Sequence, residues 1–345
     1  MQAVDTRVRP GFSAFGLAPA EKTGPFLIAG ESPIARPGRT VHRAEIRSRR
    51  RPRWGSAAAV LVGVLVCLWS QPPIAEDRVM PTRAALPPQF IHDAKTKPIW
   101  QSVDGHSIRY LVSLPKDWSP DRRWPVIVVI TGSSSNFPVI AQGYHDVRGD
   151  RPFILITPAT VSSGSKIDTD LYPHLSQDEL ARLAAASVRE KLAYDMAGLE
   201  RILAEVGEKF AGDSKAYLSG FSMGGTLAWQ MALLRSDLLH MAFPVCAMYK
   251  EEASGLIPAG HRPANPALPI RAFQGEKDPW LDGFDKHWER ASGLAKQAGF
   301  QDVTRTVTGR GHSWYYGEIL ELCAEHHAAL HRAAPPQAVP TESRP

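Results

Sequence analysis

A chain of 345 residues, 43% hydrophobic and 22% charged, has an ordinary globular composition with room for one large domain or two small ones. Its net charge of +5 is unevenly divided, because residues 1–97 carry 15 lysines and arginines against 7 acidic residues, and the remainder carries 25 against 28. The basic excess therefore belongs to the N-terminal segment, and nothing in the mildly acidic remainder indicates nucleic-acid binding.

The two ends of the chain lack the hydrophobic periodicity of a folded domain. Residues 1–55 are basic and rich in Pro, Gly and Ala, which predicts disorder. Residues 71–97 are rich in proline and mixed in charge, as in a linker. Residues 333–345 return to Pro and Ala and predict a disordered tail. The folded domain is therefore expected at residues 98–332.

An unbroken apolar run of 13 residues at 57–69 follows the basic sequence RRRPR. The run is too short for a full membrane span, so residues 56–70 predict the core of a signal peptide. The bulky residues before Ser70 leave an uncleaved membrane anchor as the alternative. Because about 50 residues rarely precede such a core, Val41 is a candidate for the true start. We expect an exported protein, secreted, periplasmic or held at the membrane by this segment.

The sequence of this domain predicts strands that alternate with helices. Residues 99–103 and 107–113, separated by Asp104-Gly105, predict a β-hairpin with an Asp-Gly turn. In chain order, the further predicted elements are strands at 124–131 and 153–157, a helix at 192–210, a strand at 215–220, a helix at 225–234, strands near 241–246 and 270–274, a helix near 284–298, a strand near 303–307 and a helix at 315–332. This alternation predicts a mostly parallel, twisted sheet with helices on both faces.

The pentapeptide Gly220-Phe221-Ser222-Met223-Gly224 lies where a predicted strand passes into a predicted helix. A G-x-S-x-G sequence in that context forms a sharp turn that projects the serine hydroxyl above the sheet. The flanking glycines allow the backbone to approach itself closely. Ser222 is therefore the predicted nucleophile of a serine hydrolase.

A serine nucleophile needs a base and an orienting acid, which follow it in the order acid and then histidine in this arrangement. Asp278, after the predicted strand at 270–274, is the candidate acid, with Glu276 and Asp282 as competitors. His312, in the glycine-rich loop after the strand at 303–307, is the candidate base.

Backbone N–H groups are expected to stabilise the oxyanion that forms during attack. Met223, directly after the nucleophile, supplies one of them at the start of a helix. The second is expected from the loop after the strand at 124–131, from Ser133 or, next to it, Gly132.

Trp280, Trp314 and Tyr315 flank the predicted acid and base, and are candidates for an apolar acyl or aryl pocket, with core packing as the alternative. Residues 160–191 form a long connection that is rich in Ser and Gly and then helical. Its length and position make it a candidate lid, with an ordinary surface excursion as the alternative.

Cys246 and Cys323 are expected as buried free thiols, with a single disulfide as the alternative in an oxidising compartment. His327 and His331 have the i, i+4 spacing of metal ligands, but no third ligand is apparent, so a solvated helix face is expected and no metal site is predicted.

Four motifs carry a likeness to a known family: YDMAGL at 194–199, GFSMGG at 220–225, GEKDP at 275–279 and GRGHSW at 309–314. Through them the segment from about 98 to 332 resembles the α/β-hydrolase esterases of the polyhydroxybutyrate depolymerase and feruloyl esterase group. The chain departs from that group at the oxyanion loop, where Thr131-Gly132 stands in place of the usual His-Gly.

The resemblance and the Ser222, Asp278 and His312 set together imply one α/β-hydrolase domain. It is expected to cleave small-molecule or polymeric carboxylic esters through an acyl-enzyme, without a cofactor. An exported peptidase or amidase with the same triad is the first alternative. A non-catalytic binding protein with a hydrolase fold is the second, and the complete residue set counts against it.

Overall fold

The computed structural model describes residues 86–133, 136–164 and 166–333. The chain divides into two units, 1–73 and 74–345, and every described residue belongs to the second. The predictions for residues 1–55 and 56–70, like that for the tail beyond residue 333, lie outside the described residues. Within the described part of the chain, no helix combines the length and apolarity needed to cross a membrane.

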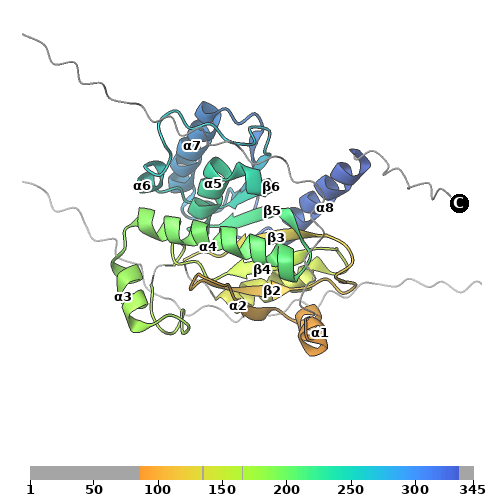
Figure 1. Ribbon diagram of the computed structural model, residues 1–345. Coiled ribbons are helices and arrows are strands. Elements are labelled where there is room, and N and C mark those ends of the chain that lie inside the picture. The colour runs from red at the N-terminus through yellow and green to blue at the C-terminus, as the bar shows by residue number, and fades with distance from the viewer. Residues whose placement is uncertain (1–85, 134–135, 165, 334–345) are drawn as a thin grey trace, which may run out of the picture. The chain divides into compact units, whose positions relative to one another are not determined.

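A sheet of eight strands runs through the described domain (Figure 1). The strands are β1 (Ile99–Ser102), β2 (Arg109–Ser113), β3 (Trp124–Ile130), β4 (Ile154–Pro158), β5 (Gly212–Phe221), β6 (Leu239–Val245), β7 (Ile270–Gly275) and β8 (Val303–Thr308). Their order in the sheet is β1-β2-β4-β3-β5-β6-β7-β8. Strand β2 pairs antiparallel with β1 and β4, and all other pairs are parallel. The predicted mostly parallel sheet is therefore confirmed.

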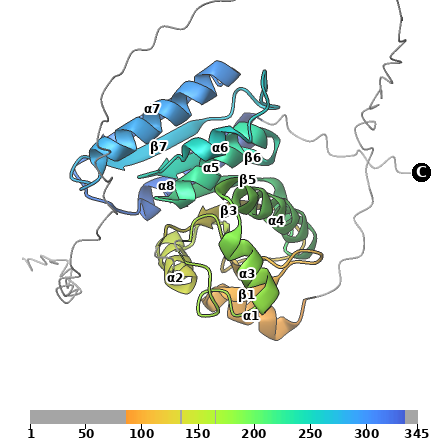
Figure 2. The ribbon, with the colours of Figure 1, turned by 90° about the vertical axis from the view of Figure 1, so that its left-hand side faces the viewer.

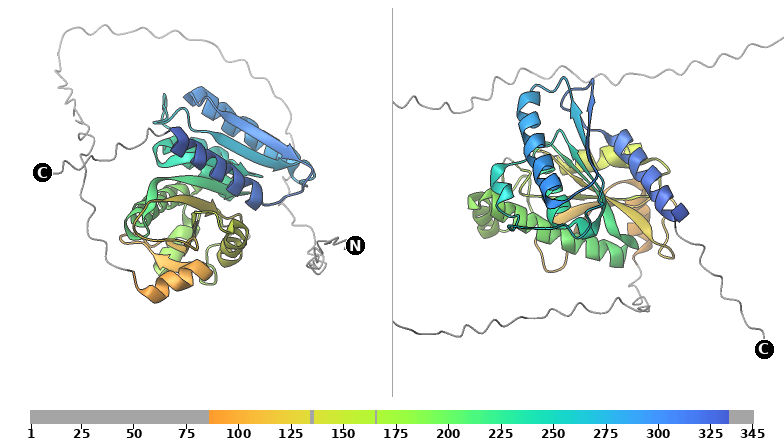
Figure 3. Two further views of the ribbon diagram at one scale, coloured as in Figure 1. Left: turned by 90° about the vertical axis from the view of Figure 1, so that its right-hand side faces the viewer. Right: turned by 90° about the horizontal axis from the view of Figure 1, so that it is seen from above.

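Helices pack on both faces of this sheet, as predicted. They are α1 (Pro88–Thr96), α2 (Phe137–Arg148), α3 (Gln177–Ala185), α4 (Val188–Lys209), α5 (Gly224–Leu234), α6 (Glu251–Ser254), α7 (Leu281–Ala298) and α8 (Tyr316–Ala333). Apolar side chains of α4, α5 and α7 form one core with the sheet, and those of α2 and α8 form another. The right panel of Figure 3 shows α7 and α8, the two blue helices, on opposite sides of the strands.

Strand β3 shows how the sequence creates two cores. All seven of its residues are buried, as the unbroken apolar run at 124–131 predicts. Val126 and Val128 point into the core beneath α4 and α5, whereas Ile127 and Val129 point into the core beneath α2 and α8. Successive side chains of a strand face opposite sides, so a strand covered on both faces must be apolar throughout.

Three helices lie where the sequence analysis predicted none: α1, α2 and the four-residue α6. Helix α1 occupies the end of the predicted linker at 71–97, and it packs on the core through buried Ala94, whose carbonyl accepts the N–H of Leu114 at 2.8 Å. The domain therefore begins before residue 98. Helix α2 follows β3, and the side chain of Asn136 caps it by accepting the N–H of Val139 at 3.2 Å.

The predicted hairpin of β1 and β2 forms, but its turn is longer than an Asp-Gly turn. Six residues, 103–108, separate the paired ends of the strands. Gly105 has a φ of +71°, as the sequence suggested. The N–H of Asp104, however, donates to the carboxylate of Glu205 on α4 at 3.3 Å. This contact between distant segments sets the loop conformation, which local turn chemistry cannot predict.

Candidate active site

Ser222 occupies the turn between β5 and α5, as the G-x-S-x-G pattern predicts. Its φ of +52° is unusual for a residue that is not glycine, and such strain concentrates at functional sites. Hydrogen bonds fix the turn: the Ser222 N–H donates to the carbonyl of Val245 at 2.9 Å, and its carbonyl accepts the N–H groups of Gly225 at 3.0 Å and Met248 at 2.9 Å. The backbone of Ser222 is therefore held by β6 and the segment after it.

The two glycines of the pentapeptide are required by close packing. A Cβ on Gly220 would lie 2.5 Å from the carbonyl oxygen of Gly224, and one on Gly224 would lie 2.3 Å from that of Thr131. Contacts this short force the backbone apart, so only glycine fits at either position. The sequence argument for these residues is thus confirmed in atomic detail.

Asp278 and His312 lie together at the ends of β7 and β8. The Nδ1 of His312 is 2.7 Å from Oδ2 of Asp278, whose side chain is fully buried. The competing acids Glu276 and Asp282 are exposed. The two loops are tied to each other, since the N–H of Lys277 donates to the carbonyl of Arg310 at 2.9 Å. Of the three candidate acids, Asp278 is the one in contact with the histidine.

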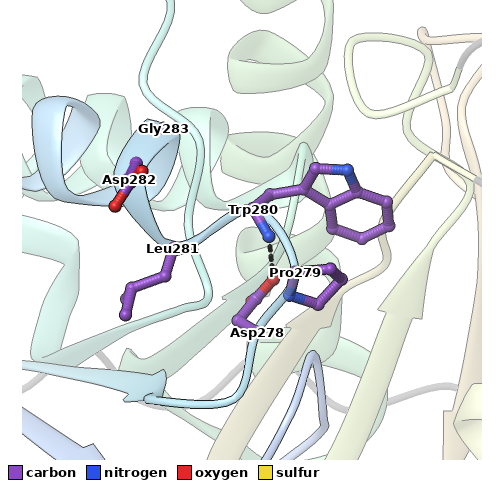
Figure 4. Close-up of a pocket in the computed structure, with 6 residues that line it drawn as sticks. All are labelled: Asp278, Pro279, Trp280, Leu281, Asp282 and Gly283. Atoms are coloured by element: carbon purple, nitrogen blue, oxygen red, sulfur yellow. Dashed lines mark hydrogen bonds between the residues drawn. The ribbon is translucent and has the colours of Figure 1, made fainter.

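Two further donors hold the carboxylate of Asp278. Gln274 donates through Nε2 to Oδ2 at 3.0 Å, and the backbone N–H of Trp280 donates to Oδ1 at 3.0 Å, shown by the dashed line in Figure 4. Phe284 stacks on His312 with ring centroids 5.3 Å apart. The sequence analysis missed Gln274 and Phe284. The signal for Gln274 was a polar amide directly after the apolar pair Ala272-Phe273 at the buried end of the strand.

The loop after β3 approaches the predicted nucleophile, as the expected oxyanion site requires. A Cβ on Gly132 would lie 3.2 Å from the Cβ of Ser222, so the backbone of Gly132 passes directly beside the serine. Met223 precedes the first residue of α5, where helix N–H groups concentrate partial positive charge. Ser133, half-buried, lies next to residues 134–135, which the structure does not describe.

The predicted aromatic pocket separates into three environments. Trp280 is 61% exposed, stands perpendicular to His312 at 5.1 Å between ring centroids, and borders an open depression of about 450 Å³ formed by residues 278–283 (Figure 4). Trp314 stacks on Phe221 at 4.2 Å and lines a different depression. Tyr315 is fully buried and stacks on Phe273. The pocket prediction for Tyr315 is therefore wrong, because its ring belongs to the core.

The two cysteines of the described domain are buried and free, as expected. A sulfur of Cys246, a carboxylate oxygen of Asp278 and a ring nitrogen of His312 lie within 4.8 Å of one another. Burial raises the pKa of the Cys246 thiol to about 11. His327 and His331 contact each other at 3.0 Å between Nε2 atoms. Among the described residues, no third ligand joins that histidine pair.

The connection at 160–191 contains α3 and is fastened to the start of α4. Asp195 accepts the N–H groups of Val161 at 2.9 Å and Ser162 at 2.7 Å, and burial raises the pKa of its carboxyl group to about 7. Tyr172 donates its hydroxyl to the carbonyl of Thr160 at 2.7 Å. Figure 2 shows α3 beside α4 and away from α7. Asp195 lies in one of the quoted motifs, but the sequence analysis assigned no role to it.

The chain matches one protein-family model and is similar to several solved structures. Residues 102–334 match the family model described as "Putative esterase". No curated protein matches the chain. Among solved structures, the chain is similar to Thermogutta terrifontis esterase 2 phosphorylated by paraoxon, with 17% identity over 70% of this chain and 97% of that one and a TM-score of 0.48. It is also similar to a ferulic acid esterase, with 18% identity over 66% and 97% and a TM-score of 0.46.

A third similar structure is the Bacillus cereus carboxylesterase, with 18% identity over 64% of this chain and 94% of that one and a TM-score of 0.45. The sheet order, the turn at Ser222 and the family match together identify the α/β-hydrolase fold. Because the family model covers more than half of the chain, the chain belongs to this esterase family and is an enzyme that hydrolyses esters.

Proposed function

We propose that the protein cleaves carboxylic esters through a Ser222–His312–Asp278 triad and an acyl-enzyme intermediate. The observation that carries this proposal is the hydrogen bond between the buried Asp278 and the partly buried His312, close to a strained serine turn. The ring of His312 also lies 4.6 Å from that of Phe221, the residue directly before the serine. These contacts support a site in which the acid, the base and the nucleophile meet at one end of the sheet.

The hydrogen bond to Asp278 gives His312 its catalytic role. With the imidazole proton on Nδ1 facing Asp278, Nε2 is left as the acceptor for the hydroxyl proton of Ser222. Ser222 then attacks the ester carbonyl, and the carboxylate stabilises the imidazolium that forms. Gln274 and the Trp280 N–H hold the carboxylate in place for both tasks.

The oxyanion that forms on attack is assigned to the N–H of Met223 and to an N–H of Gly132 or Ser133. The closeness of Gly132 to Ser222 and the position of Met223 at the start of α5 support this assignment. Loss of one such donor costs about 2.7–4 kcal/mol of transition-state stabilisation. His312 then protonates the departing alcohol, and water activated by the same histidine hydrolyses the acyl-enzyme.

The contact of Trp280 with His312 assigns this tryptophan to the alcohol side of the substrate, because His312 delivers the proton to that group. Trp314, stacked on Phe221, is retained as a candidate for another part of the substrate pocket. We also propose that the substrate is a small-molecule or polymeric ester. The protein is exported through residues 56–70, and residues 160–191 form a lid.

The test compares Ser222→Ala with Ser214→Ala, a control on the exposed face of the same strand. We expect Ser222→Ala to lose hydrolysis of p-nitrophenyl acyl esters and labelling by a fluorophosphonate probe, and Ser214→Ala to keep both. Asp278→Asn should lower kcat by about 10⁴-fold. Labelling or turnover that persists in Ser222→Ala would remove this serine from the mechanism. Faster cleavage of peptide substrates than of esters would instead favour a peptidase.

A further inference from the structure

The end of β6 bends so that a thiol faces the proposed acid and base. Cys246 follows the last residue of β6 with a φ of +41°, in the left-handed region that residues other than glycine rarely occupy. Its N–H donates to the carbonyl of Phe273 on β7 at 2.8 Å, which holds the bend. The side chain is fully buried and lies within 4.8 Å of Asp278 and His312. The proposed mechanism makes no use of this thiol.

We propose that Cys246, Asp278 and His312 form an inhibitory Zn²⁺ site. A thiolate, a carboxylate and an imidazole are the three side-chain ligand types that zinc accepts, and three protein ligands leave its fourth position to water. Zinc bonds of about 2.0–2.3 Å set ligand atoms roughly 3.5 Å apart in a tetrahedron. The present separations, none above 4.8 Å, are therefore within about 1.3 Å of the required geometry. The metal regulates the enzyme in this proposal and is no cofactor.

Zinc bound at this site prevents His312 from acting as the general base, although it does not cover Ser222. Nδ1 of His312, which faces Asp278 at 2.7 Å, becomes the metal ligand. The single proton of the neutral imidazole then resides on Nε2, so that Nε2 no longer accepts the proton of Ser222. The Cys246 thiol loses its proton to solvent when its sulfur bonds to the metal. No electron transfer is involved.

Access to the site predicts slow inhibition. The side chain of His312 is 18% exposed, whereas those of Cys246 and Asp278 are buried. Zinc must therefore reach the buried ligands by passing the imidazole ring of His312, which has to move aside. We expect inhibition to develop over time after mixing, and to be reversed by a chelator.

The chain offers two matched controls for this site. Cys323 is the second buried thiol, and it packs among apolar residues of the α2–α8 core. His327 and His331 form an i, i+4 pair on α8, a spacing at which two histidines can bind one zinc ion. Cys323→Ala therefore controls for thiols in general, and His331→Ala for zinc bound elsewhere.

The first experiment measures hydrolysis of p-nitrophenyl acetate against free Zn²⁺, with each variant normalised to its own rate without metal. We expect Cys246→Ala to raise the half-inhibitory concentration at least about tenfold, the smallest effect usual for loss of even an outer partner of a metal site. Cys323→Ala and His331→Ala should match the wild type. Equal inhibition of Cys246→Ala and the wild type would overturn the proposal.

The second experiment does not depend on activity, although the inhibitory consequence rests on the proposed triad. Co²⁺ is added to Ser222→Ala, with and without Cys246→Ala, and the thiolate-to-cobalt charge-transfer absorption is recorded. We expect the band in Ser222→Ala and in Cys323→Ala, and its loss with Cys246→Ala. Absence of the band in Ser222→Ala would refute the metal site. If the cobalt band appears but replacement of Ser222 does not lower ester turnover, the proposed triad is refuted and the metal site stands.

Discussion

The turn at Ser222 and the connection between β4 and α4 are positioned in opposite ways. In the turn, neighbouring residues leave no room for side chains at Gly220 and Gly224, and the backbone of Ser222 is bonded on both sides. In the connection, hydrogen bonds from Asp195 and Tyr172 act together with a small hydrophobic cluster. Dense packing against the sheet therefore fixes the proposed nucleophile, whereas a few hydrogen bonds and a small cluster fix the candidate lid.

The largest effect is expected from Gly220→Val. The new side chain would meet the carbonyl oxygen of Gly224 at 2.5 Å and the Cβ of Ala228 at 2.6 Å. Overpacking of this kind costs about 1–3 kcal/mol or more, and here it also displaces Ser222. We expect a lower free energy of unfolding in urea and no measurable esterase activity. Wild-type turnover by this variant would show that the turn tolerates more than its packing implies.

A smaller effect, dependent on pH, is expected from Asp195→Asn. The carboxyl pKa is about 7 in the fold, against about 3.9 when unfolded. Between these values the native state keeps a proton that the unfolded state has lost, so Asp195 makes the wild type less stable as pH rises from about 4 to 7. Asparagine does not titrate. We therefore expect the variant to gain stability relative to the wild type over this range.

Equilibrium unfolding at several pH values measures that difference. Each unit of pKa shift corresponds to about 1.4 kcal/mol, so a gain on the order of a few kcal/mol is expected. His240, whose pKa burial lowers to about 4, contributes the opposite pH dependence, but it is present in both proteins and cancels. A difference that stays constant from pH 4 to pH 7 would contradict a titrating Asp195.

Tyr172→Phe tests whether the connection acts as a lid. Loss of the hydroxyl bond to the carbonyl of Thr160 should cost about 1 kcal/mol of stability. If the segment covers the substrate, KM should also change, and kcat should change with the rate of opening. Unchanged kinetics together with the expected loss of stability would identify an ordinary surface excursion. Unfolding and steady-state kinetics on the same preparation distinguish the two outcomes.

The smallest effect is expected from Gly293→Ala. This variant is the control for Gly220→Val, because it also replaces a glycine but at a position where a side chain has room. Gly293 lies within α7, and a Cβ there would meet no atom within 4 Å. Alanine should therefore stabilise the protein by about 0.5–1 kcal/mol and leave activity unchanged. Thermal unfolding measures the gain. A loss of stability would mean that helix α7 does not tolerate side chains where the space around it is open.

The candidate site was predictable where the signal is local. The pentapeptide carries its own strand, turn and helix, and Asp278 and His312 each follow a recognisable strand. Cys246 was missed as a neighbour of Asp278, because that contact joins the ends of two separate strands, β6 and β7, and leaves no spacing in the sequence. Gln274 was missed although it lies only four residues before Asp278, because a spacing of four does not reveal that the loop folds back onto the end of its own strand. Tyr315 was misplaced for the converse reason: it is next to Trp314 in sequence but faces the core.

Elsewhere the fold was predictable where hydrophobic periodicity is strong. The buried strands and α4 were found, whereas α1 and α2 were not. Helix α1 buries one residue, Ala94, so its apolar stripe is weak. Helix α2 contains Gly143, which weakens a helical signal. Its stability comes from packing between the sheet and α8, which the local sequence does not reveal.

The connection between β4 and α4 has a hydrophobic cluster separate from the two cores of the sheet. Tyr172, Leu175, Leu180 and Leu183 gather there with Phe137 and Ala141. A segment with its own cluster can unfold as a cooperative unit while the rest of the protein stays native. Amide hydrogens of α3 should then exchange with solvent through partial unfolding, at lower free energy than those of β3 and β5. If the proposed lid covers the substrate, partial unfolding of this unit would open it.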